Sequence, residues 1–115
     1  MKKHKVIIYC LFMVCLFLTA CIISRPQPQD CEVVNTTIVK ITEGPTFDIV
    51  FHNVKGDYYY INRGLEQGLN LDELNSSVLN KNVTLHLAKI WGGSVVSEHI
   101  AQLAIDEKII YTEFK

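Results

Sequence analysis

Three consecutive tyrosines, residues 58–60, form the most chemically distinctive run in this sequence. An aromatic ring can stack on the face of a sugar or a base, and the phenol hydroxyl adds a hydrogen bond. Alternate residues of a β-strand point to opposite faces of a sheet, so the first and third tyrosines share one face. If the preceding segment pairs with this strand, the predicted binding surface consists of Asp48, His52, Tyr58, Tyr60 and Asn62.

The same tyrosines can also stabilise a sheet without binding a ligand, because aromatic cross-strand pairs are favourable in themselves. Under either interpretation, the alternation places a second set of side chains toward the core, namely Phe47, Ile49, Phe51, Tyr59 and Ile61. The pattern therefore predicts which side of the sheet is exposed. Both interpretations of the exposed tyrosines stay open.

Residues suited to metal binding or catalysis are scattered along the chain. His52, His86 and His99 do not occur at the spacing of an HxH or HExxH motif, so no metal or cofactor is predicted. The acidic pairs 72–73 and 106–107 fall at a predicted helix start and a predicted turn, where negative charge needs no catalytic explanation. No nucleophile elbow or glycine-rich phosphate loop occurs. These observations favour a protein that is not an enzyme, with a small hydrolase as the alternative, because a site built by the tertiary structure leaves no local motif.

The N-terminus carries a targeting signal. Three lysines within the first five residues precede an uncharged apolar run over residues 6–18. The run ends in Leu18, Thr19, Ala20 and Cys21. Basic residues stay on the cytoplasmic side, and the apolar run enters the membrane as a short helix. This N-terminus resembles the signal peptide of bacterial lipoproteins, with residues 18–21 as its lipobox.

The resemblance implies that residues 1–20 are removed and that the Cys21 sulfur is acylated, for example with palmitate. Two or three acyl chains anchor a protein durably in a membrane of the cell envelope, because each buried methylene contributes about 0.8 kcal/mol. Ile22 rather than aspartate follows the cysteine, which favours the outer membrane where a cell has two. The alternative is an uncleaved transmembrane anchor of roughly 18 apolar residues that continues to Ser24.

The charges and thiols of the mature chain limit its partners. After removal of residues 1–20, eight basic and twelve acidic residues remain, a net charge of −4. Nucleic acid is disfavoured as a partner, because its binding needs clustered lysine and arginine. Cys10 and Cys15 leave with the signal peptide and Cys21 carries lipid, so Cys31 has no partner for an internal disulfide. It is expected to be a buried free thiol, with an intermolecular bridge as the alternative.

Residues 21–30 are predicted to be a tether, and residues 31–115 are predicted to be a folded domain. Pro26 and Pro28 have restricted φ angles, and the glutamines beside them have little to bury, which indicates an extended segment. The length that follows suffices for one domain. The tether would hold this domain off the membrane, on the periplasmic or extracellular side.

Six strands and one helix are predicted in the domain. Branched and alternating apolar residues indicate the strands, and turn-forming residues separate them. The helix has Asn70 as its N-cap and Asp72 and Glu73 in its first turn, and its apolar face consists of Leu71, Leu74 and Val78. The expected elements are strands over residues 31–42, 47–53, 58–61, 83 towards 91, 100–105 and 108–112, and a helix from 71 to 79.

Three strands, a helix and further strands is the order of the OB-fold, a five-stranded Greek-key barrel. The segment YYYINRGLEQGLNLDEL is also similar to small exported bacterial proteins of uncharacterised function that share this strand-to-helix junction. We therefore expect a mainly β protein with one short helix, folded as a small OB-like barrel of five to six strands. An SH3-like or other small open barrel is the alternative.

In OB-folds, the outer surface of strands two and three binds oligosaccharides and oligonucleotides. The leading functional hypothesis is accordingly a lipid-anchored, non-enzymatic module of the cell envelope that binds a protein or glycan through the tyrosine-bearing surface. A structural or inhibitory subunit of an envelope assembly, associating through a sheet edge or Cys31, is the second hypothesis. A small hydrolase is the third.

Overall fold

In the computed structural model, which describes residues 26–115, the alternating apolar segments form six β-strands. The predictions for the signal peptide and Cys21 lie outside these residues. Within residues 26–115, no helix has both the length and the apolar character needed to cross a membrane. The elements are η1 (Pro28–Asp30), β1 (Cys31–Glu43), η2 (Pro45–Phe47), β2 (Ile49–Asn53), β3 (Tyr58–Ile61), η3 (Gly64–Gln67), α2 (Leu71–Val78), β4 (Asn82–Ile90), β5 (Val95–Ile105) and β6 (Lys108–Thr112), where η denotes a 3-10 turn.

The strands close into a barrel. β1 pairs antiparallel with β2 on one side and with β4 on the other, and β2 pairs with β3. β5 pairs with β4 and also returns to β3, where Tyr60 and His99 pair in parallel. Five strands are thereby closed, and β6 adds to the C-terminal half of β5. This topology, with α2 between β3 and β4, confirms the predicted OB-like barrel.

Apolar side chains that alternate along the strands fill the barrel. Leu74 and Val78 of α2 are buried against this core, as the sequence predicts. Asn70 caps the helix, since the backbone N–H groups of Asp72 and Glu73 donate to its Oδ1 at 2.8 and 3.2 Å. The largest fully buried side chains are Phe51, Ile38, Ile49, Ile61, Leu85, Ile100, Leu103, Val78 and Val83.

The second strand begins later than the sequence predicts, at Ile49. Phe47 lies in η2 with 54% of its surface exposed, so its predicted place in the core is wrong. Thr46 and Phe47 have left-handed φ values of 52° and 65°, and the Gly44 N–H donates to the Asp48 carbonyl at 2.8 Å. This tight loop breaks the alternation and leaves the aromatic ring in solvent.

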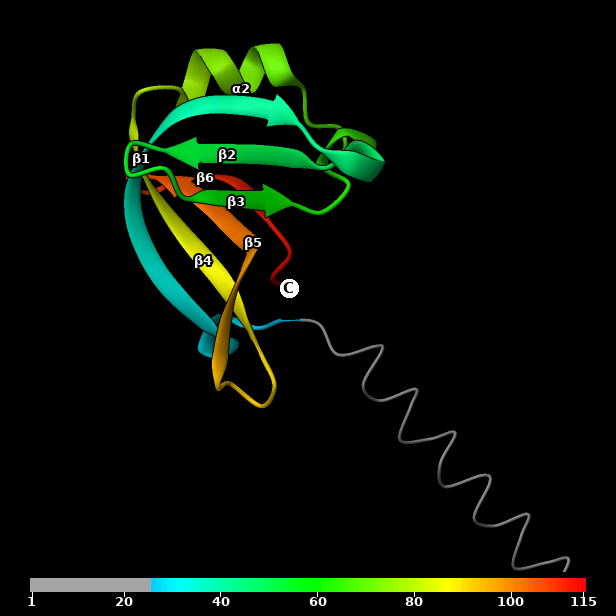
Figure 1. Ribbon diagram of the computed structural model, residues 1–115, viewed down its shortest axis with the longest axis vertical. Coiled ribbons are helices and arrows are strands. Elements are labelled where there is room, and N and C mark those ends of the chain that lie inside the picture. Colours follow the sequence, from blue (N-terminus) through cyan, green and yellow to red (C-terminus); the bar gives the residue numbers. More distant parts are fainter. Residues whose placement is uncertain (1–25) are drawn as a thin grey trace, which may run out of the picture.

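The fifth strand begins earlier than predicted, at Val95 instead of Ile100. Ile90 pairs with Val95, and residues 91–94 form the turn between them. β4 and β5 therefore form a long hairpin. Figure 1 shows α2 at one end of the barrel and the turn of this hairpin at the other.

Gly64, directly after β3, lies where the backbone approaches the core most closely among the glycines. A Cβ atom at this position would lie 2.6 Å from Cδ1 and 2.9 Å from Cγ1 of Ile49. Gly64→Ala should lower the free energy of unfolding by about 1–3 kcal/mol, because the extra methyl group displaces packed neighbours. Chemical denaturation measures this change. Glu66→Ala, exposed in the same turn, should change it by about 0.5 kcal/mol or less, and an equally small effect of Gly64→Ala would contradict the packing.

Candidate functional site

The residues predicted to form a binding surface on β2 and β3 have different surroundings. His52 pairs with Tyr58 across the two strands, and Tyr60 pairs with Val50. His52 is half-buried, with its Nε2 3.3 Å from the Thr42 hydroxyl oxygen. Tyr58 is exposed. These two strands therefore bring His52 and Tyr58 together, as the alternation predicts.

Asp48 and Asn62 stabilise the loops at the ends of these strands. The Arg63 backbone N–H donates to Asp48 Oδ1 at 2.8 Å, which links the start of β2 to the end of β3. The Asn62 carbonyl accepts a hydrogen bond from Gln67 Nε2 at 2.7 Å, which holds η3 against the strand. Both contacts are local and structural. The Asn62 side chain remains exposed.

Tyr60 belongs to a polar cluster that the sequence does not indicate. Its ring meets the His99 ring edge to face, with centroids 5.6 Å apart. His99 Nε2 in turn lies 2.7 Å from Glu113 Oε2, and both side chains are largely buried. His99 comes from β5 and Glu113 follows β6, so only the closure of the barrel brings them to Tyr60. No local spacing signals this cluster.

The Tyr60 phenol is neutral at ordinary pH. Burial raises its pKa, and the nearby carboxylates raise it further, with Asp48 contributing more than Glu98 and Glu113. A neutral phenol donates one hydrogen bond and accepts others. Tyr60 can therefore present both a ring face and a hydroxyl donor to a polar ligand.

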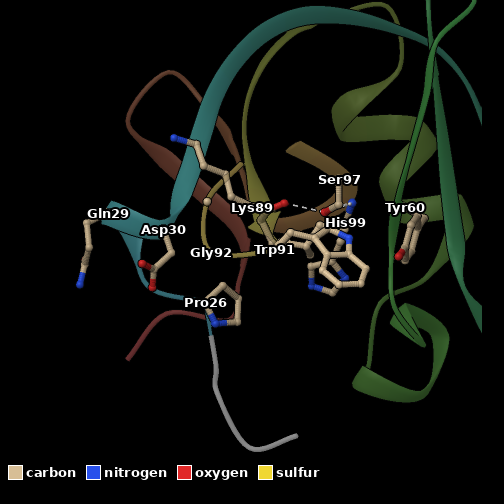
Figure 2. A pocket seen from close by; sticks show the side chains of 12 residues that line it. Pro26, Gln29, Asp30, Tyr60, Lys89, Trp91, Gly92, Ser97 and His99 are labelled. Atoms are coloured by element: carbon tan, nitrogen blue, oxygen red, sulfur yellow. Dashed lines mark hydrogen bonds between the residues drawn. The ribbon is translucent and has the colours of Figure 1, made fainter. Parts of the chain in front are cut away.

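A groove of about 960 Å³ lies beside this cluster. Figure 2 shows Trp91, Ser97 and His99 between Tyr60 of β3 and the N-terminal residues Pro26 and Asp30. Of the predicted site residues, Tyr60 alone lines the groove; Asp48, His52, Tyr58 and Asn62 do not. The lining residues are Pro26, Gln29, Asp30, Tyr60, Ala88, Lys89, Ile90, Trp91, Gly92, Gly93, Ser97 and His99.

Ser97, His99 and Glu113 are residue types that can form a hydrolytic triad, but their contacts differ from one. The Ser97 hydroxyl donates to the Ala88 carbonyl at 2.6 Å and accepts from the His99 backbone N–H at 3.2 Å. Nε2 of His99 is already in contact with the Glu113 carboxylate, whose Oε2 lies 2.7 Å away. Among the described residues, no side-chain hydrogen bond joins the serine to the imidazole. A serine nucleophile needs such a base, so the contacts of these three residues are not those of a hydrolytic triad.

Two further features bear on the chemistry of this region. Within residues 26–115, no group of three or more histidine, cysteine or acidic residues is arranged to hold a metal ion. Cys31 is free and buried beside the groove, with its Sγ donating to the Gln27 carbonyl at 3.5 Å. Burial, followed by the charge of Asp30, raises the pKa of this thiol. A protonated, buried thiol is a weak nucleophile, which agrees with the free thiol expected at this position.

Fold and site together define a small OB-like barrel with an open groove beside the contact between β3 and β5. Comparison of the chain with models of protein families, with curated proteins and with solved structures finds no match.

Proposed function

We propose that this protein is a lipid-anchored module of the bacterial cell envelope that binds a protein or glycan partner in the groove beside Tyr60. The observation that carries the proposal is the groove itself, which joins aromatic surface to converging polar groups. Binding sites are usually concave, with apolar surface and a few placed polar groups. In OB-folds, ligands bind on the face of strands two and three and at the loops between strands one and two and between strands four and five. The groove includes Tyr60 of the third strand and the loop between the fourth and fifth strands, but no residue of the second strand.

The groove chemistry suits a ligand with hydroxyl or amide groups and a face that can stack. Tyr60 offers a ring and a neutral hydroxyl. Asp30 and Lys89 add one carboxylate and one ammonium group at the exposed wall. With both charge signs present, the groove has no strong preference for an anion or a cation. A sugar chain or a polypeptide segment meets these conditions.

The N-terminal sequence supports the anchor. Lysines, an apolar run and Cys21 after small residues together favour lipoprotein processing. The extended tether predicted for residues 21–30 does not hold over Pro28–Asp30, which form the 3-10 turn η1. A tethered binding module would keep its groove close to a membrane surface. The anchoring part of the proposal concerns residues outside the described structure and is tested separately through Cys21.

Tyr60→Ser should weaken binding of the envelope partner by about 1–3 kcal/mol, because one stacking contact is lost. Partners are captured from detergent-solubilised membranes with the full chain, and their affinity is then measured for each variant. Tyr58→Ser is the matched control, since Tyr58 lies on the same strand face but does not line the groove. Thermal midpoints verify that both variants are folded.

Two results would change the proposal. Equal losses of affinity for Tyr58→Ser and Tyr60→Ser would place the binding surface over the whole outer face of β2 and β3, as the sequence predicts. Full affinity in a folded Tyr60→Ser variant would remove the groove from the proposal, leaving the tyrosines as sheet-stabilising residues.

A further inference from the structure

The turn of the β4–β5 hairpin exposes a cluster of apolar side chains, here called the hairpin tip and defined as Ile90, Trp91, Val95 and Val96. Their exposed fractions are 44%, 80%, 45% and 40%. Ile90 pairs with Val95, so these two residues share one face, and Trp91 occupies the turn itself. Val96 pairs with Lys89 and lies on the opposite face of the hairpin, so Ile90, Val95 and the turn residue Trp91 form the apolar surface of one side. Exposed apolar patches on soluble proteins mark interaction sites.

The backbone of the tip presents the tryptophan at a conformational cost. Trp91, Gly92 and Gly93 have left-handed φ values of 55°, 65° and 89°. Glycine adopts such values freely, whereas a residue with a side chain is strained there. A glycine at position 91 would therefore form this turn more easily. Trp91 nevertheless occupies the turn, where its ring lines the groove and keeps 80% of its surface exposed.

The N-terminal segment enters the domain beside the hairpin tip. Pro26 lines the same groove as Trp91, Gly92 and Gly93, and η1 leads into Cys31, which pairs with Ala88 of β4. Cys21 is five positions before Pro26 in the sequence. An extended chain spans at most about 3.6 Å per residue, so Cys21 can lie no more than about 18 Å from Pro26. Whatever surface holds Cys21 is therefore within reach of the tip.

From these observations we propose that the hairpin tip docks on the lipid surface to which Cys21 is anchored, with Trp91 at the level of the headgroups. This inference rests on the proposed lipid anchor. Tryptophan is enriched at membrane interfaces because its ring is apolar and its N–H group is polar. The anchor keeps the tip at a high effective concentration near the bilayer, so even a small apolar surface suffices to hold the tip there. The domain then has a fixed orientation, with its groove near the headgroups.

The charged residues around the tip indicate that its contact with the lipid surface depends on apolar side chains and not on charge. Lys89 is the cation that pairs across from Val96, while Asp30 lines the adjoining groove and Glu98 follows along β5. The two carboxylates outnumber the one ammonium group near the tip, and no basic cluster is present among the described residues to select anionic lipid. Docking should accordingly occur on zwitterionic phosphatidylcholine and should change little with salt, because salt screens only the charge interactions.

Trp91 is the single tryptophan of the chain and reports directly on this contact. The full, lipidated protein is reconstituted into phosphatidylcholine vesicles with and without bromine atoms on the acyl chains near the headgroups. The expected result is a loss of Trp91 fluorescence in the brominated vesicles at both low and high salt. In the vesicles without bromine, Trp91 should emit at a shorter wavelength than in the unfolded protein. Equal fluorescence in the two kinds of vesicle would overturn the inference.

Variants separate the tip from the rest of the surface. The double variant Ile90→Ser with Val95→Ser should largely lose the bromine quenching, because the apolar face beside Trp91 is gone. Val54→Ser is the matched control: Val54 is also an exposed apolar turn residue, but its N–H donates to Thr37, far along β1 from the tip. Quenching that is insensitive to the double variant would contradict docking through this surface.

Incorporation of a labelled fatty acid, measured on the same preparations, keeps the two proposals distinguishable. Labelled protein without quenching would retain the anchor and refute the docking of the tip; the Trp91 ring would then be available to a ligand in the groove. Protein that incorporates no labelled fatty acid would refute the lipid anchor, whether or not bromine quenches the Trp91 fluorescence. Labelled and quenched protein supports both.

Discussion

Replacing Cys21 by serine should abolish fatty-acid incorporation into this protein. The acyl group is attached through the cysteine sulfur in the lipoproteins that the N-terminus resembles, and cleavage follows that step. A serine hydroxyl cannot take its place, so the variant should accumulate as a precursor that keeps residues 1–20. Metabolic labelling with a fatty-acid probe, together with the mass of the protein, measures both effects.

Two other cysteines serve as controls for this experiment. Cys15 lies within the apolar run and Cys31 lies in the folded domain. The variants Cys15→Ser and Cys31→Ser should both incorporate the fatty-acid probe and be cleaved like the wild type. Labelling that persists in Cys21→Ser would contradict the lipobox assignment. An uncleaved transmembrane anchor through residues 6–24 would then be the better explanation of the N-terminus.

Phe51→Ala should lower the free energy of unfolding of residues 26–115 by about 3–5 kcal/mol, the usual cost of removing a buried aromatic ring. Phe51 has no exposed surface and is among the largest fully buried side chains of the barrel. A small domain is stable by about 5–15 kcal/mol, so the variant should be near the edge of folding. Urea denaturation followed by circular dichroism measures the difference.

Lys55→Ala is the control for this substitution, because Lys55 is exposed in the turn after β2. It should change the free energy of unfolding by about 0.5 kcal/mol or less. A loss below about 1 kcal/mol in Phe51→Ala would contradict the packing of the barrel core. The comparison therefore tests the fold independently of any partner.

The local sequence determines most of the secondary structure. Tyr58 to Ile61 and Lys108 to Thr112 form strands with the predicted bounds, because alternation of apolar residues between turn residues is a local property. The cap at Asn70 is equally local, since its side chain bonds the backbone of the next turn. The order of these elements was enough to predict the OB-like barrel.

The failures of the sequence analysis arose where neighbouring segments decide the conformation. Phe47 continues the apolar alternation with Ile49, yet the left-handed turn at residues 46 and 47 removes it from the core. Val95 and Val96 are adjacent rather than alternating, and Gly92 and Gly93 precede them, so the sequence indicated a loop. Pairing with Lys89 and Ile90 of β4 makes them a strand.

The arrangement of the predicted site residues follows from the sequence only in part. Alternation correctly placed His52 and Tyr58 on one face, but it could not show that Tyr60 meets His99 and Glu113. These residues are far apart in the chain, and the parallel contact between β3 and β5 brings them together. A non-local contact of this kind leaves no periodic signal.

By itself, then, the sequence determined the strand and helix identities, the burial of Phe51 and its neighbours, and the resemblance of the N-terminus to a lipoprotein signal. Those features depend on residues within a few positions of one another. Only the tertiary structure decided the groove beside Tyr60, the hairpin tip around Trp91 and their closeness to Pro26. Barrel closure creates all three, because it sets distances between residues that the chain itself keeps far apart.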